Sequence, residues 1–488
     1  MRGSVRAWRR LLTAVTVAAG VAVGSVSVST AHQSPAQSAA DSTGGAGIGD
    51  QYFPTSGNGG YRAQHYDVRV RFDPASEQLT GTTTVRSTPR RRLTSFHLDL
   101  ALDATSVRVN GEPSRFRQRG LELKVAPRTP LTRGGPMRVR VRYAGVPSRR
   151  LVDGYTPWVT TVDGAVAVGQ PEIAAWWFPS NDHPSDRATF DITIDAPRRL
   201  QALSNGTLVD RTRLPGRLAR WNWRSTDPMA TYLAFLAVGR YDVRSGVDGR
   251  LPYAFAVSRQ LDRQTTRDVW RSLRRTAPAT RFLASRFGRY PFDSIGGVVP
   301  GGVTSGNFSY ALENQTRPVY SPGFFAFGPD SSIIVHEMAH QWFGNGVTLR
   351  RWRHIWINEG FATYAEWLWR QQQGGPSAQQ QFRAAYDGID AGDGFWRTRI
   401  GDPGGRHLFH RTVYVRGAMT AHALRNRLGT EDFFTVTRRF VAKGGTGDTG
   451  DVRRLAERVS GERLGGFFEA WLHTARKPAA TRANGVRR

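Results

Sequence analysis

The sequence predicts an α+β protein of more than one domain, in which an antiparallel β-rich domain precedes a mostly helical domain. The chain has 488 residues, and a domain size of ~150 residues makes two or three domains the first expectation. From residue 61 to about 250, apolar and polar residues alternate, as they do in half-buried strands. From 251 to 475, apolar residues recur with helical spacing instead.

The strands are expected in short runs that Gly, Pro or Asn-Gly interrupt. The clearest runs are HYDVRVRF, LTGTTTVRS, ATSVRVNGEP, MRVRVRYAG and TFDITIDAP. Alternation places one set of side chains in a core and the other in solvent, and Asn-Gly favours the tight turn of a hairpin. The predicted β-rich domain therefore covers residues 61–250.

The helices are expected in longer runs, several of which end on Gly. These runs are RDVWRSLRRTAPATRFLASRFG, SSIIVHEMAHQWFG, INEGFATYAEWLWRQQ and VRGAMTAHALRNRLG. Apolar residues three and four positions apart give each run a buried face, and Gly ends a helix readily. The predicted helical domain covers residues 251–475.

The two ends of the chain differ from these domains. Residues 1–31 resemble an export signal, because four arginines precede the apolar run LLTAVTVAAGVAV and small residues follow it. We expect a secreted, extracellular protein without a transmembrane span in its mature form, although an uncleaved N-terminal anchor is the alternative. The small, Gly-rich residues 32–60 predict a flexible linker, and the basic residues 476–488 predict a disordered tail.

Composition excludes some kinds of chemistry. The chain has no cysteine, so it has neither disulfides nor thiolate ligands nor a cysteine nucleophile. Its net charge of +29 comes from 65 arginines but only three lysines, a skew that indicates coding bias as readily as a partner. Electrostatic association with an anionic cell envelope remains possible. Nucleic-acid binding is not expected, because no helix-turn-helix, aromatic platform or zinc-finger spacing accompanies the charge.

The segment HEMAH carries the strongest chemical signal. His336 and His340 lie one helical turn apart on the same face, where both imidazoles can reach one zinc ion, and Glu337 lies beside that face. Glu359 supplies a third ligand if the chain turns back after Gly344. Two His and one Glu leave one coordination position open for water, as in a catalytic zinc site.

Other interpretations of these residues remain open. Glu366 follows Glu359 by two helical turns, so it can accept a hydrogen bond from a ligand histidine or lie at the surface. The whole constellation can also be a set of polar core residues without a metal. The remaining histidines, among them His407, His410 and His422, are expected to be structural.

The motifs together resemble the aminopeptidase N, or membrane alanyl aminopeptidase, family of gluzincin metallopeptidases. HEMAHQWFGNGVT followed by WINEGFATYAEW is similar to its zinc segment, and YALENQT to its G-A-M-E-N signature. QPEIAAWWFPSNDHPSDRATFDITI is similar to its Q-x-E and F-P-x-x-D stretch, and VYVRGAM to its Y-x-K/R-G-A segment. The resemblance extends from residue 170 to 429 and implies a saddle-like β-sheet domain followed by a thermolysin-like zinc peptidase domain.

The resemblance assigns a role to each matching residue. It implies one zinc ion per chain on His336, His340 and Glu359, with Glu337 as general base and Tyr414 as the group that stabilises the oxyanion. It further implies that the substrate's free α-amine is held by three residues of the other motifs: Glu313, Glu172 and Gln170. In the Q-x-E motif either Gln170 or Glu172 can face the pocket.

The chain departs from the family pattern in two places. Tyr310 and Leu312 replace the Gly and Met of G-A-M-E-N, and both are expected to flank the side-chain pocket. The large C-terminal helical domain of the family is not expected, which implies a more open cleft that admits longer peptides or needs a partner.

These observations predict an exported zinc aminopeptidase that acts on peptides with a free N-terminus. One alternative is a thermolysin-like zinc endopeptidase, which would lack the amine-binding carboxylates. Another is a non-catalytic binding or scaffold protein with the same fold. A third is an envelope-binding protein whose peptidase site is incidental.

Overall fold

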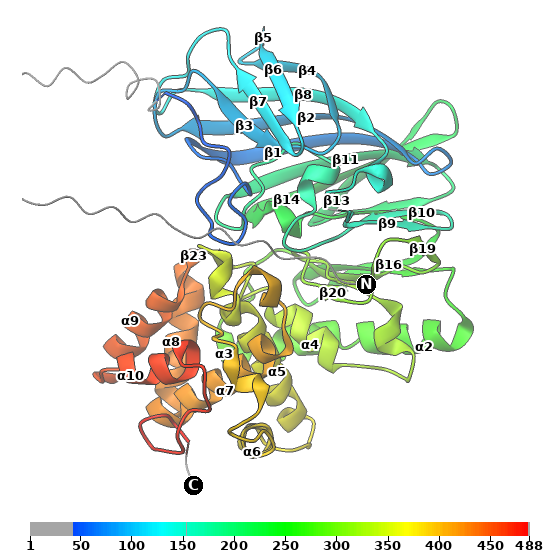
Figure 1. The fold of residues 1–488 in the computed structure, drawn as a ribbon. Helices are drawn as coiled ribbons and strands as arrows, with labels where there is room; N and C mark the ends of the chain where they lie inside the picture. Colours follow the sequence, from blue (N-terminus) through cyan, green and yellow to red (C-terminus); the bar gives the residue numbers. More distant parts are fainter. Residues whose placement is uncertain (1–41, 153, 487–488) are drawn as a thin grey trace, which may run out of the picture. The chain divides into compact units, whose positions relative to one another are not determined.

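The computed structural model describes residues 42–152 and 154–486. The predicted export signal and the first ten residues of the predicted linker lie outside these ranges. The described residues separate into a β-rich part and a mostly helical part (Figure 1). The predicted fold class is confirmed.

An eight-stranded sheet forms the frame of the β-rich part. Alternation builds it: along β1 (Tyr61–Asp73) every second side chain is buried over most of the strand. Across the sheet the eight strands lie in the order β13-β14-β11-β1-β2-β8-β4-β5. Besides β1, they are β13 (Thr207–Leu214), β14 (Leu218–Ala230), β11 (Arg187–Pro197), β2 (Gln78–Pro89), β8 (Met137–Gly145), β4 (Asp103–Val109) and β5 (Glu112–Pro113).

One pair of strands departs from the predicted antiparallel arrangement. β1 pairs in parallel with β11, with His65 opposite Thr189, while the other neighbours in this sheet are antiparallel. Parallel neighbours need a long crossover rather than a hairpin. More than a hundred residues separate β1 from β11, so a local alternation pattern does not reveal this pairing.

Two smaller sheets complete the β-rich part. The first contains β3 (Phe96–Asp99), β7 (Glu122–Ala126) and β6 (Arg115–Arg119). The second contains β12 (Gln201–Leu203), β15 (Leu236–Gly239), β10 (Gly164–Ala167), β9 (Trp158–Thr161) and β19 (Val303–Ser305). Aromatic side chains fill the core between the elements, as where the ring of Tyr66 stacks on Phe190 at 4.9 Å.

The second part of the chain begins with a mixed five-stranded sheet. Its order is β16 (Tyr241–Asp248), β17 (Leu251–Ser258), β18 (Ile295–Val299), β21 (Val319–Tyr320) and β20 (Ala311–Leu312). Because β16 pairs with β17, the change of sheet lies between β15 and β16 and not at residue 250. β19 returns from the second part to pair with β9, so the two parts share a sheet.

Helices make up most of the second part, as predicted. They are α2 (Arg263–Leu273), α3 (Thr276–Phe287), α4 (Ser332–Ala339), α5 (Trp356–Gln372), α6 (Ala378–Asp387), α7 (Arg411–Leu428), α8 (Thr430–Lys443), α9 (Thr449–Ser460) and α10 (Gly465–Phe468). A short parallel pair, β22 (Val347–Leu349) and β23 (Gly445–Gly447), lies among them. Among the described residues, no helix has the length and apolarity that a membrane crossing requires.

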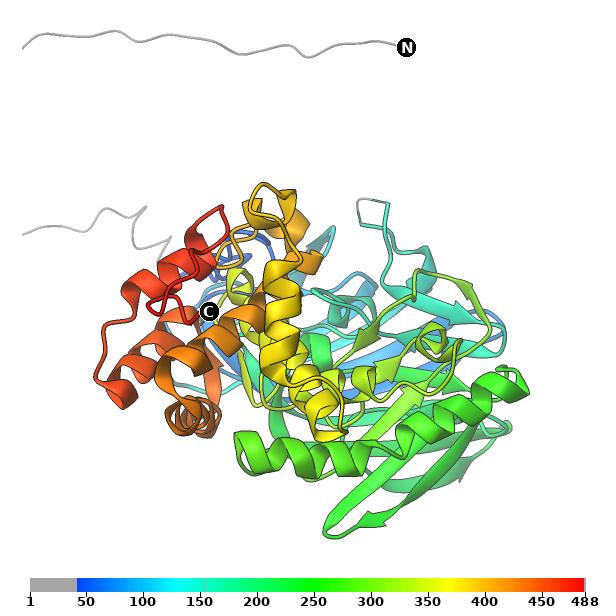
Figure 2. The same ribbon diagram turned by 90° about the horizontal axis from the view of Figure 1, so that it is seen from below.

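The helices α5 and α7 pack closely, and this contact shapes the site. Figure 2 shows α5 (yellow) beside α7 (orange). A Cβ atom on Gly360 of α5 would lie 2.8 Å from the backbone of Gly417 of α7. Only a glycine pair allows this approach, so the two glycines set the distance between the helices.

The prediction of a flexible linker is wrong for residues 42–60. Oδ2 of Asp50 accepts hydrogen bonds from the backbone N–H of Trp352 at 2.9 Å and from Nε2 of His183 at 3.1 Å. Nδ2 of Asn58 donates to Asp99 at 2.8 Å, and the hydroxyl of Tyr52 accepts from the N–H of Gly404. The segment is ordered because its few polar side chains bind both parts of the molecule.

The prediction of a disordered tail is also wrong up to residue 486. Nε1 of Trp471 donates to the carbonyl of Asn484 at 2.9 Å, and Nδ2 of Asn426 donates to the carbonyl of Gly485. The side chain of Val486 is 2 % exposed. A composition rich in Arg, Ala and Gly hides these contacts, because one apolar residue and two backbone carbonyls are enough to anchor the segment.

Candidate functional site

Helix α4 presents both histidines of HEMAH. Oδ1 of Asp330 accepts hydrogen bonds from the backbone N–H groups of Ser332 and Ile333, at 2.7 and 3.3 Å, so Asp330 caps the free amides that begin the helix. The helix ends at Ala339, and His340 follows in a helical conformation. His336 and His340 therefore keep the one-turn spacing that the sequence predicts.

The chain then turns back so that α5 meets α4. Gly344 has φ +125°, and a Cβ atom there would lie 2.9 Å from Nδ2 of Asn358, so the turn requires glycine. In consequence Glu359, in the first turn of α5, faces both histidines. Its Oε2 lies 3.4 Å from Nε2 of His336 and 3.4 Å from Nε2 of His340.

These distances match the shape of a zinc site. Ligand atoms at zinc bond lengths of 2.0–2.1 Å on a tetrahedron lie about 3.4 Å apart. The ligand atoms of the three side chains all lie within 4.8 Å of one another, and all three residues are buried. Two imidazoles and one carboxylate are also the donor set that suits zinc with one open position.

Hydrogen bonds from the Nδ1 atoms hold the two imidazoles in place. Nδ1 of His336 donates to Oε1 of Glu366 at 2.7 Å, and Nδ1 of His340 donates to the carbonyl of Phe343 at 3.1 Å. With Nδ1 occupied in both rings, Nε2 is the atom left for a metal. Of the two interpretations of Glu366, the structure supports the one in which it accepts from His336.

The electrostatics of the three residues favour a cation among them. Burial raises the pKa of Glu359, but His340 and His336 outweigh it and lower the value to about 2. Burial lowers the pKa of His340, but Glu359 and Glu313 raise it to about 9. The carboxylate is thus held as an anion. A metal ion bound at Nε2 of the two neutral imidazoles would supply the positive charge that protons supply in its absence.

Glu337 lies beside this cluster without joining it. Its side chain is buried, and its Oε2 has no hydrogen-bond partner among the described residues. Burial raises its pKa to about 8, although the two histidines act in the opposite direction. A buried, unpaired carboxylate oxygen costs free energy unless a ligand or water meets it, so Glu337 is placed to accept a proton in the site.

Tyr414 approaches from α7. Its ring stacks on the imidazole of His336 with the centroids 6.0 Å apart. Burial and then Glu359, Glu313 and Glu337 raise its pKa well above 10, which keeps the hydroxyl protonated as a donor. The close contact of Gly360 with Gly417 places this side chain against the site.

Glu313 follows β20 and is held by residues from the β-rich part. Nε2 of Gln170 donates to its Oε1 at 3.1 Å, and the hydroxyl of Tyr232 donates to the same oxygen at 2.9 Å. Nδ2 of Asn345 donates to its backbone carbonyl at 2.7 Å. Burial raises the pKa of the Glu313 carboxyl, and its other oxygen, Oε2, accepts none of these three hydrogen bonds. Glu313 is therefore positioned to receive a cation.

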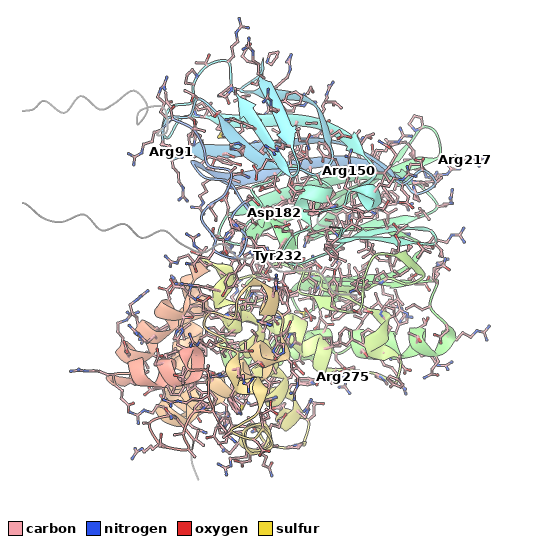
Figure 3. The ribbon with its side chains drawn as sticks, viewed as in Figure 1. Arg91, Arg150, Asp182, Arg217, Tyr232 and Arg275 are labelled. Carbon is pink, nitrogen blue, oxygen red and sulfur yellow. The ribbon has the colours of Figure 1, made fainter. Side chains whose placement is uncertain are left out.

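Tyr232 is a site residue that the motifs do not indicate. It lies in a short 3-10 turn after β14 and, in Figure 3, between the β-rich part and the helices. In the sequence it is one aromatic residue in an apolar run, and no spacing distinguishes it from a core tyrosine. Its role follows only from its hydrogen bond to Glu313.

Glu172 does not reach the site. Of the two polar residues in the Q-x-E motif, Gln170 lines the cavity and Glu172 does not. Burial and the charge of Asp182 raise the pKa of Glu172 to about 7, and Glu172 in turn contributes to the raised pKa of Asp99. Its side chain therefore lies near the carboxylates of Asp182 and Asp99 in the β-rich part.

One cavity of about 340 Å³ is lined by the three candidate zinc ligands together with Gln170, Glu313, Glu337 and Tyr414. Besides the charged groups, its wall includes Tyr310, Phe324 and Ile333, which give a side chain an apolar surface. Tyr310 is fixed by a hydrogen bond from its hydroxyl to the carbonyl of Val168 at 3.0 Å. Leu312 does not line the cavity, because successive residues of β20 point to opposite sides and Ala311 and Glu313 face it instead.

Comparison with known proteins finds that the matching family models and relatives are all peptidases. Residues 329–471 match the model of the peptidase family M1 domain, and residues 62–233 match the peptidase M1 N-terminal domain. Aminopeptidase M1-D of Oryza sativa subsp. japonica is 27% identical over 446 residues, which cover 84% of this chain and 49% of the relative. Glutamyl aminopeptidase of Bos taurus is 28% identical over 335 residues, which cover 62% and 34% of the two chains. The chain thus spans about half the length or less of these curated relatives.

Solved structures agree with this result. The M1 zinc metallopeptidase from Deinococcus radiodurans is 26% identical, with a TM-score of 0.78 over 89% of this chain and 99% of that one. An alanine mutant of that enzyme bound to a Tyr-Ser-Ala substrate is 27% identical, with the same TM-score over 89% of this chain and all of the other.

Proposed function

The chain belongs to peptidase family M1, and we propose that it is an aminopeptidase that hydrolyses the N-terminal peptide bond of peptides with a free amine. Its cofactor is one zinc ion, and the proposal assigns His336, His340 and Glu359 as the ligands. The observation that supports this assignment best is the 3.4 Å separation of each Nε2 from Oε2 of Glu359, in the same cavity as Glu313.

Glu337 is the general base of the proposed mechanism. When bound, zinc would polarise the scissile carbonyl and lower the pKa of the attacking water. Oε2 of Glu337 takes the proton of that water and later delivers it to the leaving amine. Burial supports this role, because it raises the pKa of Glu337 and so makes its carboxylate a stronger base than that of an exposed glutamate.

Tyr414 stabilises the negative charge that develops on the carbonyl oxygen. Its hydroxyl is kept protonated by burial and by three nearby carboxylates, so it donates a hydrogen bond where charge appears in the transition state. Its stacking against His336 fixes the direction of the ring.

Glu313 decides between an exopeptidase and an endopeptidase. The ammonium group of a free N-terminus satisfies the buried carboxylate, whereas the uncharged amide in the middle of a peptide leaves that carboxylate without a cation. Gln170 and Tyr232 hold the first oxygen of Glu313 and leave the second for the substrate. This arrangement supports an aminopeptidase over a thermolysin-like endopeptidase.

The presence of all these groups in one cavity also supports an enzyme over a non-catalytic scaffold. A scaffold protein has no need to keep three zinc ligands, a buried unpaired base and a protonated phenol together. Export remains part of the proposal and is supported by the arginines and the apolar run of residues 1–31. Its test is sequencing of the N-terminus of the protein recovered from the culture medium.

The proposed catalysis is tested by hydrolysis of aminoacyl-naphthylamides. We expect activity in the zinc-loaded protein, loss on chelation and recovery when zinc is returned. Glu337→Gln should lower kcat by about 10²–10⁴-fold, the range of general-base catalysis, with unchanged zinc content. Glu431→Gln, at an exposed position of α8, is the control. Activity that survives chelation, or a Glu337→Gln variant as active as the control, would contradict the proposal.

A further inference from the structure

The outward face of the eight-stranded sheet carries two different charge patterns. On β1, β11 and β14, arginines alternate with aspartates and form ion pairs. Arg69 lies 3.0 Å from Asp67, and Arg220 lies 2.7 Å from Asp195. Arg224 pairs with Asp191 in the same way. Positive charge on this half of the face is therefore largely neutralised.

The other half of the same face has arginines without acidic partners. It consists of β2, β8 and β4, which lie side by side at the end of the β-rich part away from the helices (Figure 1). We call its five exposed arginines, Arg86, Arg108, Arg138, Arg140 and Arg142, the arginine ladder. Within residues 42–152 and 154–486, none of the five forms an ion pair, and only Arg108 donates a hydrogen bond, to the carbonyl of Gly111.

The strand register places like charges directly opposite each other. Arg86 of β2 faces Arg138 of β8, and Arg140 of β8 faces Arg108 of β4. Opposite residues on neighbouring strands have Cβ atoms only ~5 Å apart, where like charges destabilise the sheet. Along β8 the arginines recur at every second residue, about 7 Å apart. The ladder is thus a dense cationic array that the fold maintains at a cost.

Coding bias does not explain the ladder. The same bias toward arginine acts on β1, β11 and β14, where aspartates accompany the arginines at matching positions of the face. On β2, β8 and β4 the outward residues between the arginines are hydroxyl side chains such as Thr82, Thr84 and Ser106. The one aspartate of these three strands, Asp103 at the start of β4, pairs with Arg150 and not with the ladder. The difference between the two halves indicates a partner that carries the missing negative charge.

We propose that the arginine ladder binds a flexible polymer of phosphate groups, and so tethers the enzyme to an anionic surface of the cell envelope. Guanidinium groups bind phosphate through paired hydrogen bonds, and a flexible chain can follow cations that lie about 5–7 Å apart. The ladder contributes no residue to the peptidase cavity. The proposal is therefore independent of the catalytic one.

Two features favour this partner over others. The ladder strands expose no aromatic side chain on which the bases of single-stranded nucleic acid would stack. No large apolar side chain on the described part of these strands is exposed to enter a lipid bilayer either. What remains is a polar, cationic surface that suits an anionic polymer without stacking bases or a bilayer.

The test uses the full protein and long-chain inorganic polyphosphate as the probe. Arg138→Thr, Arg140→Thr and Arg142→Thr are combined in one variant. The matched control combines Arg69→Thr, Arg220→Thr and Arg224→Thr, which removes the same charge from the ion-paired half. We expect the ladder variant to lose at least tenfold in affinity at low salt, with the control within threefold of the unmodified protein. The salt dependence should also weaken, by a slope of about 2 for three lost contacts.

Several outcomes overturn the proposal. Equal losses in the two variants would mean that net charge alone attracts the probe. Unchanged binding in both would mean that the ladder is not the site. Single-stranded DNA and phosphatidylglycerol vesicles are measured in parallel, and a ladder-dependent affinity higher for either one than for polyphosphate would identify that class as the partner instead. Cooperative thermal unfolding and unchanged naphthylamide hydrolysis show that both variants are folded.

Discussion

At the scale of single residues, four carboxylates differ in what surrounds them. Two imidazoles lower the pKa of Glu359 to about 2 against the effect of burial, which suits a permanent metal ligand. Burial raises the pKa of Glu337 to about 8, which suits a group that exchanges a proton. Glu313 has a raised pKa and two donors on one oxygen, which suits a receptor for an ammonium ion. Glu172 also has a raised pKa, about 7, but it does not line the cavity.

The position of Glu172 predicts a pH-dependent change in stability without a change in catalysis. Its pKa is about 7 in the folded protein and 4.5 without burial, so the folded state loses stability as pH rises through this interval. Glu172→Gln removes this loss. We therefore compare the free energy of unfolding of the variant with that of the unmodified protein. The difference, variant minus unmodified protein, should increase by about 2 kcal/mol between pH 5 and pH 8.

Urea unfolding at the two pH values measures this difference, and naphthylamide hydrolysis is followed in parallel. An equal change in stability at both pH values would contradict the burial of an ionisable Glu172. A hundredfold loss of activity would return Glu172 to the amine-binding site.

At the scale of elements, residues 42–60 connect both parts of the molecule to the site. Asp50 binds the N–H of Trp352, in the turn that precedes α5 and Glu359. The ring of Trp352 packs on that of Tyr232 at 5.4 Å, and Tyr232 donates to Glu313. The segment thus supports both the proposed zinc ligand on α5 and the carboxylate that is proposed to bind the amine.

Asp50→Ala tests whether this segment is structural. The change leaves the N–H of Trp352 and a nitrogen of His183 without their acceptor, and an unpaired buried donor costs about 1–3 kcal/mol. We expect the free energy of unfolding to fall by that amount in urea denaturation. The control is Asp73→Ala, which removes an exposed carboxylate that binds only its neighbours in a turn. Similar small effects in the two variants would restore the interpretation of a flexible linker.

The sequence predicts elements well where the signal is local. Alternation identifies β1 and β8, and the helical spacing of HEMAH with Glu359 identifies three residues that the structure brings together. The sequence does not predict the features that depend on contacts between distant segments. The parallel pairing of β1 with β11, the order of residues 42–60 and the part played by Tyr232 all depend on contacts between segments more than 80 residues apart. Spacing also leaves open which residue of Q-x-E points into a cavity.

At the scale of the whole molecule, the proposed amine-binding site depends on both parts of the fold. Gln170 and Tyr232 come from the β-rich part, whereas Glu313 and the zinc ligands come from the second part. The proposed specificity for a free N-terminus therefore arises from the way the two parts meet, and not from the zinc helix alone. A zinc site on α4 and α5 without this contact would accept any peptide bond that reaches it.

The most direct test of this account compares one peptide with a free amine and its N-acetylated twin. We expect kcat/KM of the zinc-loaded protein to be at least about 10³-fold higher for the free amine, because acetylation leaves the buried carboxylate of Glu313 without a cation. In Glu313→Gln the ratio should collapse toward one, mainly through loss on the free-amine peptide. Equal hydrolysis of the two peptides by the unmodified protein would show that the site is an endopeptidase and that Glu313 does not bind the amine.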